Sequence, residues 1–185
     1  MILIVDLNFR RDSLGFYEFV LPISYAVRDL DMCSFKHYLD LTSDDVAKSS
    51  SIILSGTPFK DHATLNEPEK FSWLKNCQTP VLGICAGMQT IALVFGAKLE
   101  KCLSLGMTRV VTTAPNPLFS STFQAYTLHN YSVKSPKDFE VLAESEKCVQ
   151  AIKHKSKEIF GVLFHPEVRN PEIIQHFVQA FRVTE

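Results

Sequence analysis

Apolar runs alternate with segments of helical periodicity through the first half of the chain. The runs are short and continuous, as in strands buried on both faces of a parallel sheet. They are Ile2–Val5, Ser51–Ser55 and Pro80–Ile84. Apolar residues at helical spacing predict the helices Phe19–Leu30, Glu67–Asn76 and Met88–Phe95. Gly96 is a natural stop for the last of these helices. This alternation predicts an α/β fold.

Short strand candidates, separated by turn residues, replace this alternation in the second half of the chain. They are Met107–Thr113, Phe123–Leu128, Val141–Ala143, Ala151–His154 and Ile159–Phe164. A terminal amphipathic helix is predicted over Pro171–Phe181, because it starts with proline and carries apolar residues at helical spacing. No linker or repeat divides the chain. We therefore expect residues 1–185 to form one three-layer α/β domain, with a mostly parallel central sheet flanked by helices and a partly antiparallel edge.

Composition narrows the class of protein further. The formal net charge is −1, which implies no strong attraction to nucleic acid or to anionic membranes. The apolar runs are far too short to span a bilayer, and no signal peptide precedes the first strand, so we expect a cytoplasmic protein. The five cysteines are odd in number and form no CxxC pair. That pattern argues against a disulfide framework and against a zinc site.

The stretch Val81–Gln89 carries the most informative chemistry. An apolar strand leads into Cys85, a helix begins directly after it, and Gly83 and Gly87 stand two residues to either side. This is the layout of a nucleophile elbow, in which glycines allow a close approach of strand and helix. The helix N-terminus favours the nucleophilic thiolate, and the N–H of Ala86 would point at the oxygen of a tetrahedral intermediate. A core cysteine beside a glycine-rich turn is the alternative.

A cysteine nucleophile needs a base, and His165 is the best placed of the six histidines. It follows the predicted strand Ile159–Phe164, so it would lie at a carboxyl end, where ligands bind in α/β sheets. Glu167 stands two residues on, past a proline that stiffens the turn, and its carboxylate can orient the imidazole. Taken alone, His165 is equally well interpreted as a structural histidine, and Glu167 as a solvated charge.

The two segments together resemble the class I glutamine amidotransferases. Gly83–Gln89 resembles the GxCxGxQ signature of that family, and Gly161–Val168 is similar to its GVQFHPE signature. Leu54–Pro58 is similar to the SGGP oxyanion loop, and Leu128–Tyr131 to the segment that lines the glutamine pocket. The resemblance spans nearly the whole chain, with the segments in the right order.

The resemblance implies a mechanism and a set of site residues. Cys85 would attack the side-chain amide of glutamine, and His165, oriented by Glu167, would move the protons. Hydrolysis of the γ-glutamyl thioester would give glutamate and ammonia, with no metal or organic cofactor. The backbone N–H groups of Thr57 and Ala86 would hold the oxyanion. The residues expected to hold glutamine are Gly56, Gln89, Asn130 and Tyr131.

Three positions depart from the family pattern. Thr57 stands where the family usually has glycine, and a positive φ there would strain a β-branched residue. One consequence to test is a resting loop in which the Thr57 N–H points away from the oxyanion until a partner turns it back. Leu163 replaces the usual glutamine before Phe164, and the residues after Val168 lack the usual threonine and glycine.

The chain shows neither a synthetase domain nor a P-loop pattern, so we expect ammonia to pass to a separate synthetase subunit or to be released. The form His165-Pro166-Glu167-Val168 resembles the corresponding segment in the glutaminase subunit of GMP synthase, a purine-forming enzyme. Glutaminases of anthranilate and aminodeoxychorismate synthases more often have serine in place of Val168. The same residues would also suit a free-standing γ-glutamyl hydrolase, and a non-enzymatic module on a retired fold is a further hypothesis. The intact cysteine, histidine and glutamate speak against the non-enzymatic module.

Overall fold

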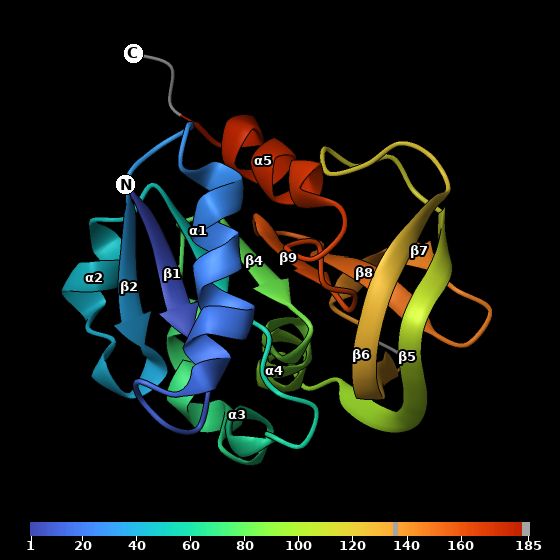
Figure 1. Cartoon of the computed structure of the whole chain (residues 1–185), viewed down its shortest axis with the longest axis horizontal. Helices are drawn as coiled ribbons and strands as arrows, with labels where there is room; N and C mark the ends of the chain where they lie inside the picture. The colour runs from blue at the N-terminus through green and yellow to red at the C-terminus, as the bar shows by residue number, and fades with distance from the viewer. Residues whose placement is uncertain (135–136, 183–185) are drawn as a thin grey trace.

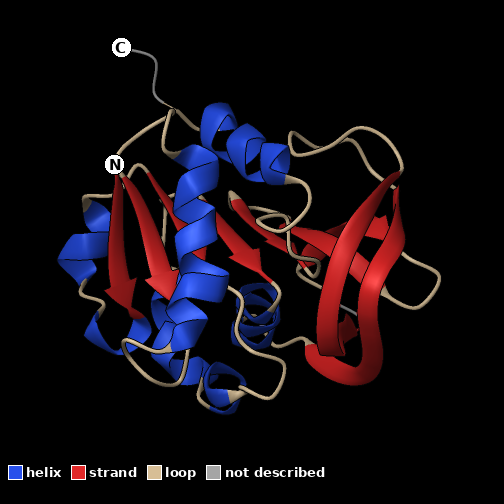
Figure 2. Ribbon diagram, viewed as in Figure 1, coloured by secondary structure: helices blue, strands red, loops and turns tan. Residues whose placement is uncertain are grey.

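The computed structural model describes residues 1–134 and 137–182 and shows a twisted sheet with helices on both faces (Figures 1 and 2). In this part of the chain nine strands form the sheet, in the order β2-β1-β3-β4-β9-β8-β7-β5-β6. Their bounds are β1 (Ile2–Asp6), β2 (Cys33–His37), β3 (Ser51–Leu54), β4 (Val81–Ile84), β5 (Lys98–Thr112), β6 (Phe123–Lys134), β7 (Phe139–Glu144), β8 (Val149–His154) and β9 (Ile159–Val162). The predicted α/β fold class is confirmed.

The strands β2, β1, β3, β4 and β9 are parallel neighbours, so their carboxyl ends meet at one edge of the sheet. Every residue of β1, β3, β4 and β9 is buried, which explains why these strands are continuous apolar runs in the sequence. Successive side chains enter opposite cores. Ile2 and Ile4 pack on one face of the sheet, and Leu3 and Val5 pack on the other.

The remaining strands form the antiparallel part of the sheet that the sequence predicted as a partly antiparallel edge. β8 pairs with β9, β7 with β8, and β5 with both β7 and β6. β5 and β6 form a long curled hairpin that stands out from the parallel part (Figure 1). A register shift between Lys101 and Ser104 interrupts this pairing. A bulge of this kind bends a strand and increases its twist.

Two groups of helices complete the three layers. On one face α1 (Leu21–Val27) packs beside α5 (Pro171–Ala180), as Figure 1 shows. On the other face α4 (Ala86–Val94) packs against the 3₁₀ segment η3 (Pro68–Lys75). The shorter elements are η1 (Phe16–Val20), η2 (Tyr38–Asp40), α2 (Ser43–Ala47) and α3 (Ala63–Asn66). In the described parts of the chain, no helix combines the length and the hydropathy that a bilayer crossing requires.

Several predicted element bounds are wrong, and the reasons are local. The helix predicted over Phe19–Leu30 ends at Val27 and is preceded by a π-helical turn that starts at Phe16. The segment Glu67–Asn76 is a 3₁₀ connector rather than an α-helix, a form common in short links between elements. The strand predicted over Met107–Thr113 begins much earlier, at Lys98. The prediction missed its first residues because they are mostly exposed and several are charged.

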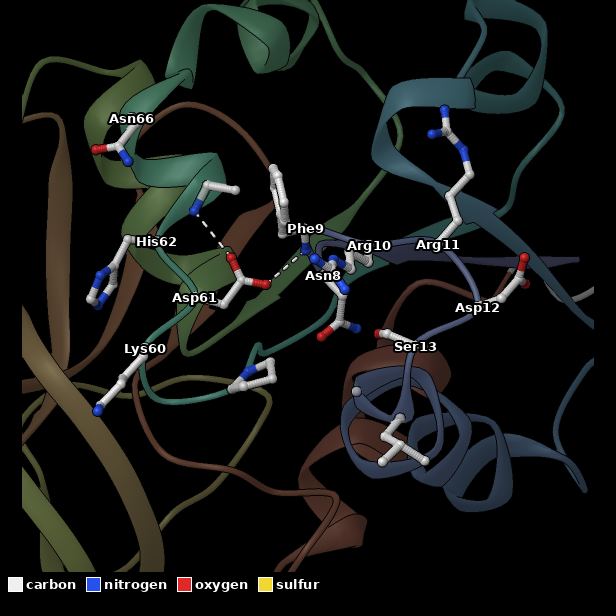
Figure 3. A pocket seen from close by; sticks show the side chains of 14 residues that line it. Asn8, Phe9, Arg10, Arg11, Asp12, Ser13, Lys60, Asp61, His62 and Asn66 are labelled. Carbon is white, nitrogen blue, oxygen red and sulfur yellow. Dashed lines mark hydrogen bonds between the residues drawn. The ribbon is translucent and has the colours of Figure 1, made fainter.

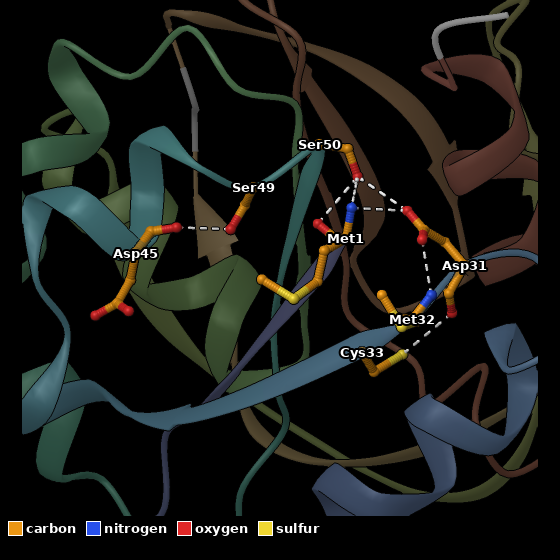
Figure 4. Close-up of polar contacts among 7 residues, drawn as sticks. All are labelled: Met1, Asp31, Met32, Cys33, Asp45, Ser49 and Ser50. Carbon is orange, nitrogen blue, oxygen red and sulfur yellow. Dashed lines mark hydrogen bonds and ion pairs between the residues drawn. The ribbon is translucent and has the colours of Figure 1, made fainter.

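The amino ends of the first strands are held together at the edge of the sheet opposite their carboxyl ends. The N-terminal ammonium of Met1 lies 2.8 Å from a carboxylate oxygen of Asp31 and donates to Ser50 Oγ at 3.1 Å (Figure 4). This ammonium lowers the pKa of the Asp31 carboxyl. Asp31 precedes β2 and Ser50 precedes β3, so the cluster ties both strands to β1.

Candidate active site

Cys85 occupies the sharp turn between β4 and α4. Its φ of 47° and ψ of −100° are unusual for a residue with a side chain and store strain in the turn. Two backbone hydrogen bonds hold this geometry. The N–H of Cys85 donates to the carbonyl of Val162 on β9 at 2.8 Å, and its carbonyl accepts from the N–H of Gln89 at 3.0 Å. The predicted nucleophile elbow is therefore present.

The glycines around the elbow allow backbone segments to touch. A Cβ on Gly83 would lie 2.5 Å from the carbonyl carbon of Gly87, and a Cβ on Gly87 would lie 2.6 Å from the carbonyl oxygen of Leu54. Neither position has room for a methyl group. The start of α4 can therefore pack directly on β3 and β4, which places the Cys85 side chain at the carboxyl edge of the sheet.

His165 and Glu167 lie together in the turn that follows β9. His165 Nδ1 is 2.7 Å from Glu167 Oε1, and both side chains are buried. The backbone N–H of His165 donates to the carbonyl of Tyr126 on β6 at 2.8 Å. Because Nδ1 faces the carboxylate, Nε2 is the nitrogen left for Cys85, and in the described residues it makes no other hydrogen bond.

Glu167 and Cys85 together favour the protonated form of His165. Burial disfavours the imidazolium of His165, but the Glu167 carboxylate and the Cys85 sulfur outweigh burial and raise the pKa of His165 well above its ordinary value. A histidine held in this way can accept a proton from a thiol and keep it. The Cys85 thiol also lies 3.6 Å from the carbonyl oxygen of Leu128, to which it donates.

Gly56 lies against the imidazole of His165. A Cβ at this position would be 2.7 Å from His165 Cε1 and 3.2 Å from His165 Nδ1. Phe19 contacts the same ring, with 5.6 Å between ring centroids. Gly56 and Phe19 therefore help to confine the His165 ring, a role that sequence reasoning did not assign to either residue.

The loop after β3 places Thr57 beside the elbow. Thr57 and Ala86 both line the small cavity at Cys85. Among the described residues with a side chain, only Asp12 and Cys85 have positive φ, so the strain considered for Thr57 is absent in this conformation. The Thr57 hydroxyl donates to the carbonyl of Asp61 at 3.1 Å and closes the loop on itself.

Three of the four residues expected to hold glutamine, Gln89, Asn130 and Tyr131, line a small cavity beside Cys85. Its volume is about 20 Å³, room for roughly one water molecule. Gln89 Nε2 donates to the carbonyl of Tyr131 at 2.7 Å, and Asn130 Nδ2 donates to the carbonyl of Phe59 at 3.0 Å. His62 meets the Tyr131 ring edge-on. The Asn130 and His62 contacts form a clasp that holds the loop after β3 onto β6, and in this conformation the cavity has no room for glutamine.

His129, the other histidine in a family-like segment, has a different environment. Its Nδ1 lies 2.9 Å from the carbonyl oxygen of Cys102, which can only accept, so Nδ1 carries the proton. Burial lowers the pKa of His129 to about 4. His129 is therefore a neutral structural residue next to the site, whereas His165 has both a carboxylate and a thiol as neighbours.

Three lining residues escaped sequence reasoning altogether. Phe59, Asp61 and His62 line the cavity at Cys85 together with the expected residues. They follow the oxyanion loop but match no signature, and they meet β6 only through tertiary contacts, because β3 and β6 are far apart in the strand order. Gln89, Asn130 and Tyr131 lie at the cavity as expected, although their polar groups are occupied by one another and by Phe59.

Comparisons with known proteins agree with this site. The family model described as Glutamine amidotransferase class-I matches residues 22–183. One subunit of the glutamine-hydrolysing GMP synthase of Methanococcus maripaludis is 39% identical over 165 residues, which cover 84% of this chain and 85% of that protein. The corresponding subunit of Picrophilus torridus is 34% identical over 169 residues, covering 85% and 90%.

Solved structures with a similar fold include further proteins described as glutamine amidotransferases or GMP synthase subunits. A solved structure from Thermoplasma acidophilum, described as a candidate subunit of GMP synthase, has a TM-score of 0.81 at 25% identity and covers 97% of this chain and 93% of its own. A glutamine amidotransferase of Thermotoga maritima shares the fold, with a TM-score of 0.70 at 19% identity. Since the family model spans most of the sequence, the chain belongs to the class-I glutamine amidotransferase family.

Proposed function

We propose that this chain is the glutaminase subunit of a two-subunit GMP synthase, and that it passes ammonia from glutamine to a separate synthetase subunit. The observation that carries the proposal is the buried pair of His165 and Glu167, 2.7 Å apart, beside Cys85 on its strained turn. The relatives that match most of the chain are named as subunits of a glutamine-hydrolysing GMP synthase. The five thiols are free, which fits the reducing cytoplasm.

The proposed chemistry assigns one role to each member of the group. Cys85 Sγ attacks the amide carbon of the glutamine side chain, and its proton passes to His165 Nε2. The protonated His165, held by Glu167, gives that proton to the departing nitrogen, so ammonia leaves and a γ-glutamyl thioester forms. His165 then takes a proton from water, which attacks the thioester and releases glutamate.

Oxyanion stabilisation falls to two backbone donors. The N–H of Ala86 lies at the start of α4, where the helix leaves such groups without internal partners. The N–H of Thr57 approaches from the loop after β3. Both residues line the cavity at Cys85. A donor aimed at the developing oxyanion is worth about 2.7–4 kcal/mol of transition-state stabilisation.

Gln89, Asn130 and Tyr131 would bind glutamine once the clasp opens. The Asn130 amide and the Tyr131 carbonyl now bond to Phe59 and Gln89, and both can exchange those partners for the amino and carboxylate groups of a substrate. Gly56 supports the same site indirectly, because its missing side chain makes room for His165.

Substitution of Cys85 tests the proposal. Cys85→Ala and Cys85→Ser should lose glutamine hydrolysis, measured as glutamate release, while GMP formation from free ammonia with the synthetase subunit is retained. Cys33→Ala, at a half-buried thiol far from the site, is the matched control and should keep full glutaminase activity. Residual hydrolysis above about one per cent in both Cys85 variants would exclude Cys85 as the nucleophile, because loss of a catalytic nucleophile costs about 10⁶-fold.

A further inference from the structure

A large crevice opens at the carboxyl ends of β1 and β3, next to the cavity at Cys85. It has a volume of about 930 Å³. One wall is the loop after β1, Asn8–Gly15, and the other is the loop after β3 with the start of α3, Pro58–Asn66 (Figure 3). β2 lies on one side of β1 and β3 on the other, so the chain changes direction along the sheet at this point. Such switch points are where doubly wound sheets bind their ligands.

The crevice and the glutamine cavity share a wall. Pro58, Asp61 and His62 line both spaces. Asp61 also joins the two walls of the crevice, because its carboxylate accepts from the backbone N–H of Phe9 at 2.7 Å and from that of Ala63 at 3.1 Å (Figure 3). Whatever occupies the crevice therefore touches the segment that closes the glutamine cavity.

The charges of the crevice favour an acidic occupant. Arg11 is paired with Asp40 through two hydrogen bonds of 2.7 and 2.8 Å. Asp61 is satisfied by the two backbone N–H groups just described. In the described residues Arg10 and Lys60, one from each wall, form no ion pair, and Asp12 is the one other charged side chain of the lining. The two walls of the crevice thus each carry one cation that has no ion-pair partner in the described residues.

Large apolar side chains stand exposed around the same opening. Leu14 is 78% exposed and Phe9 is 64% exposed, and both line the crevice. Tyr17, two residues beyond the lining, is 64% exposed. Apolar groups gathered in this way mark protein–protein contact sites, and aromatic and arginine side chains are the usual anchors there.

We infer that this crevice is the docking site for a segment of the synthetase subunit that carries acidic side chains beside an apolar one. The inference rests on the proposed function, because ammonia made at Cys85 must reach another protein before it is lost to solvent. A partner seated in the crevice lies against the shared wall of Pro58, Asp61 and His62. Docking there gives the synthetase a direct means of loosening the clasp between Phe59 and Asn130, so that glutamine enters when the acceptor is present.

Charge reversal tests the docking site. Arg10→Glu combined with Lys60→Glu should weaken binding of the purified synthetase subunit about tenfold, measured by calorimetry, and should reduce the dependence of binding on salt. Lys75→Glu with Lys98→Glu makes the same change of charge at exposed lysines outside the crevice and should bind as the wild type does. Stimulation of glutamine hydrolysis should shift to higher synthetase concentration by the same factor, with the basal rate unchanged.

A second pair of variants tests the apolar part of the docking site. Leu14→Ser should weaken binding, whereas Met32→Ser, at a residue that is 75% exposed but lies at the opposite edge of the sheet, should not. Equal affinity of the wild type and the Arg10/Lys60 variant would overturn the inference, as would equal losses in the variant and its lysine control. So would saturable binding of inorganic phosphate that disappears in the variant, or self-association of the chain that the variant abolishes.

Binding and hydrolysis are measured separately, so failures of the two proposals can be told apart. A chain that binds the synthetase through Arg10 and Lys60 but releases no glutamate would refute the proposed glutaminase and keep the docking site. A chain that hydrolyses glutamine but binds no synthetase would keep the glutaminase and overturn the docking site.

Discussion

Replacement of Gly56 by alanine should disable the enzyme without unfolding it. The new Cβ would stand 2.7 Å from His165 Cε1, 3.2 Å from His165 Nδ1 and 3.4 Å from Phe19 Cδ1. Carbon atoms in contact normally lie about 3.5–4.0 Å apart, so the imidazole must move by roughly 1 Å. Glu167 holds the ring through Nδ1 at 2.7 Å, so the shift disturbs that hydrogen bond and the alignment with Cys85.

The expected magnitude follows from this displacement. A shift of about 1 Å in a catalytic group can cost about 100-fold in rate, which equals about 2.7 kcal/mol of transition-state stabilisation. Overpacking by one methyl group costs the fold about 1–3 kcal/mol. A protein of this size has roughly 5–15 kcal/mol of stability, so the Gly56→Ala variant should remain folded while its turnover collapses.

Steady-state glutamate release and urea unfolding, measured on the same preparations, separate these two effects. The control is Gly106→Ala, at a glycine with φ of 102° and no atom within 4 Å of the added carbon. Strain at that position should lower stability and leave kcat unchanged, whereas Gly56→Ala should lower both. If Gly56→Ala keeps more than half of the wild-type kcat, His165 has room to move and the argument fails.

Three further outcomes are expected. His165→Ala should lose about as much glutaminase activity as loss of Cys85, whereas His129→Ala should keep most of it, and the reverse ranking would show that the base is wrongly assigned. The raised pKa of His165 means that its imidazolium stabilises the folded protein below the pKa of an unfolded histidine, about 6.5, and that this stabilisation is lost as pH rises through the folded value. The stability difference between wild type and Glu167→Gln, from urea unfolding, should thus be widest near pH 6 and narrow as pH rises; a gap independent of pH contradicts the pairing. Thr57→Gly should raise basal glutamine hydrolysis, by up to about 100-fold if one oxyanion donor is now turned away, and should reduce stimulation by the synthetase. An unchanged basal rate would mean that threonine already presents its N–H.

The catalytic segments could be predicted because each is encoded within a few consecutive residues. An apolar strand, a cysteine between two glycines and a helix are enough to specify the elbow around Cys85, since the strain at φ 47° arises within the turn itself. His165 and Glu167 are likewise two residues apart, and their 2.7 Å contact needs only the turn that Pro166 stiffens. The parallel strands β1, β3, β4 and β9 could be predicted equally well, because burial on both faces leaves them almost entirely apolar.

Half-exposed elements gave no such signal. β2 (Cys33–His37) carries partly exposed residues along most of its length, so neither a continuous apolar run nor a clean alternation marks it. β5 begins with a mostly exposed stretch at Lys98 and contains the irregularity between Lys101 and Ser104. A pattern of period two is lost where a strand bulges, and pairing with β6 then decides the structure.

The features that control access to the site are the least visible in the sequence, because they join segments far apart in the chain. The hydrogen bond from Asn130 to Phe59 joins residues 71 positions apart, and no local sequence pattern predicts such a contact. β4 has β3 as one neighbour and β9 as the other, so the loops after β3 and β9 both reach the elbow. That adjacency puts Gly56 beside His165 and sets Pro58–His62 between the glutamine cavity and the basic crevice. A change in the crevice can therefore reach the cavity at Cys85 through one short loop, even though Arg10 and Cys85 are far apart in sequence and follow different strands.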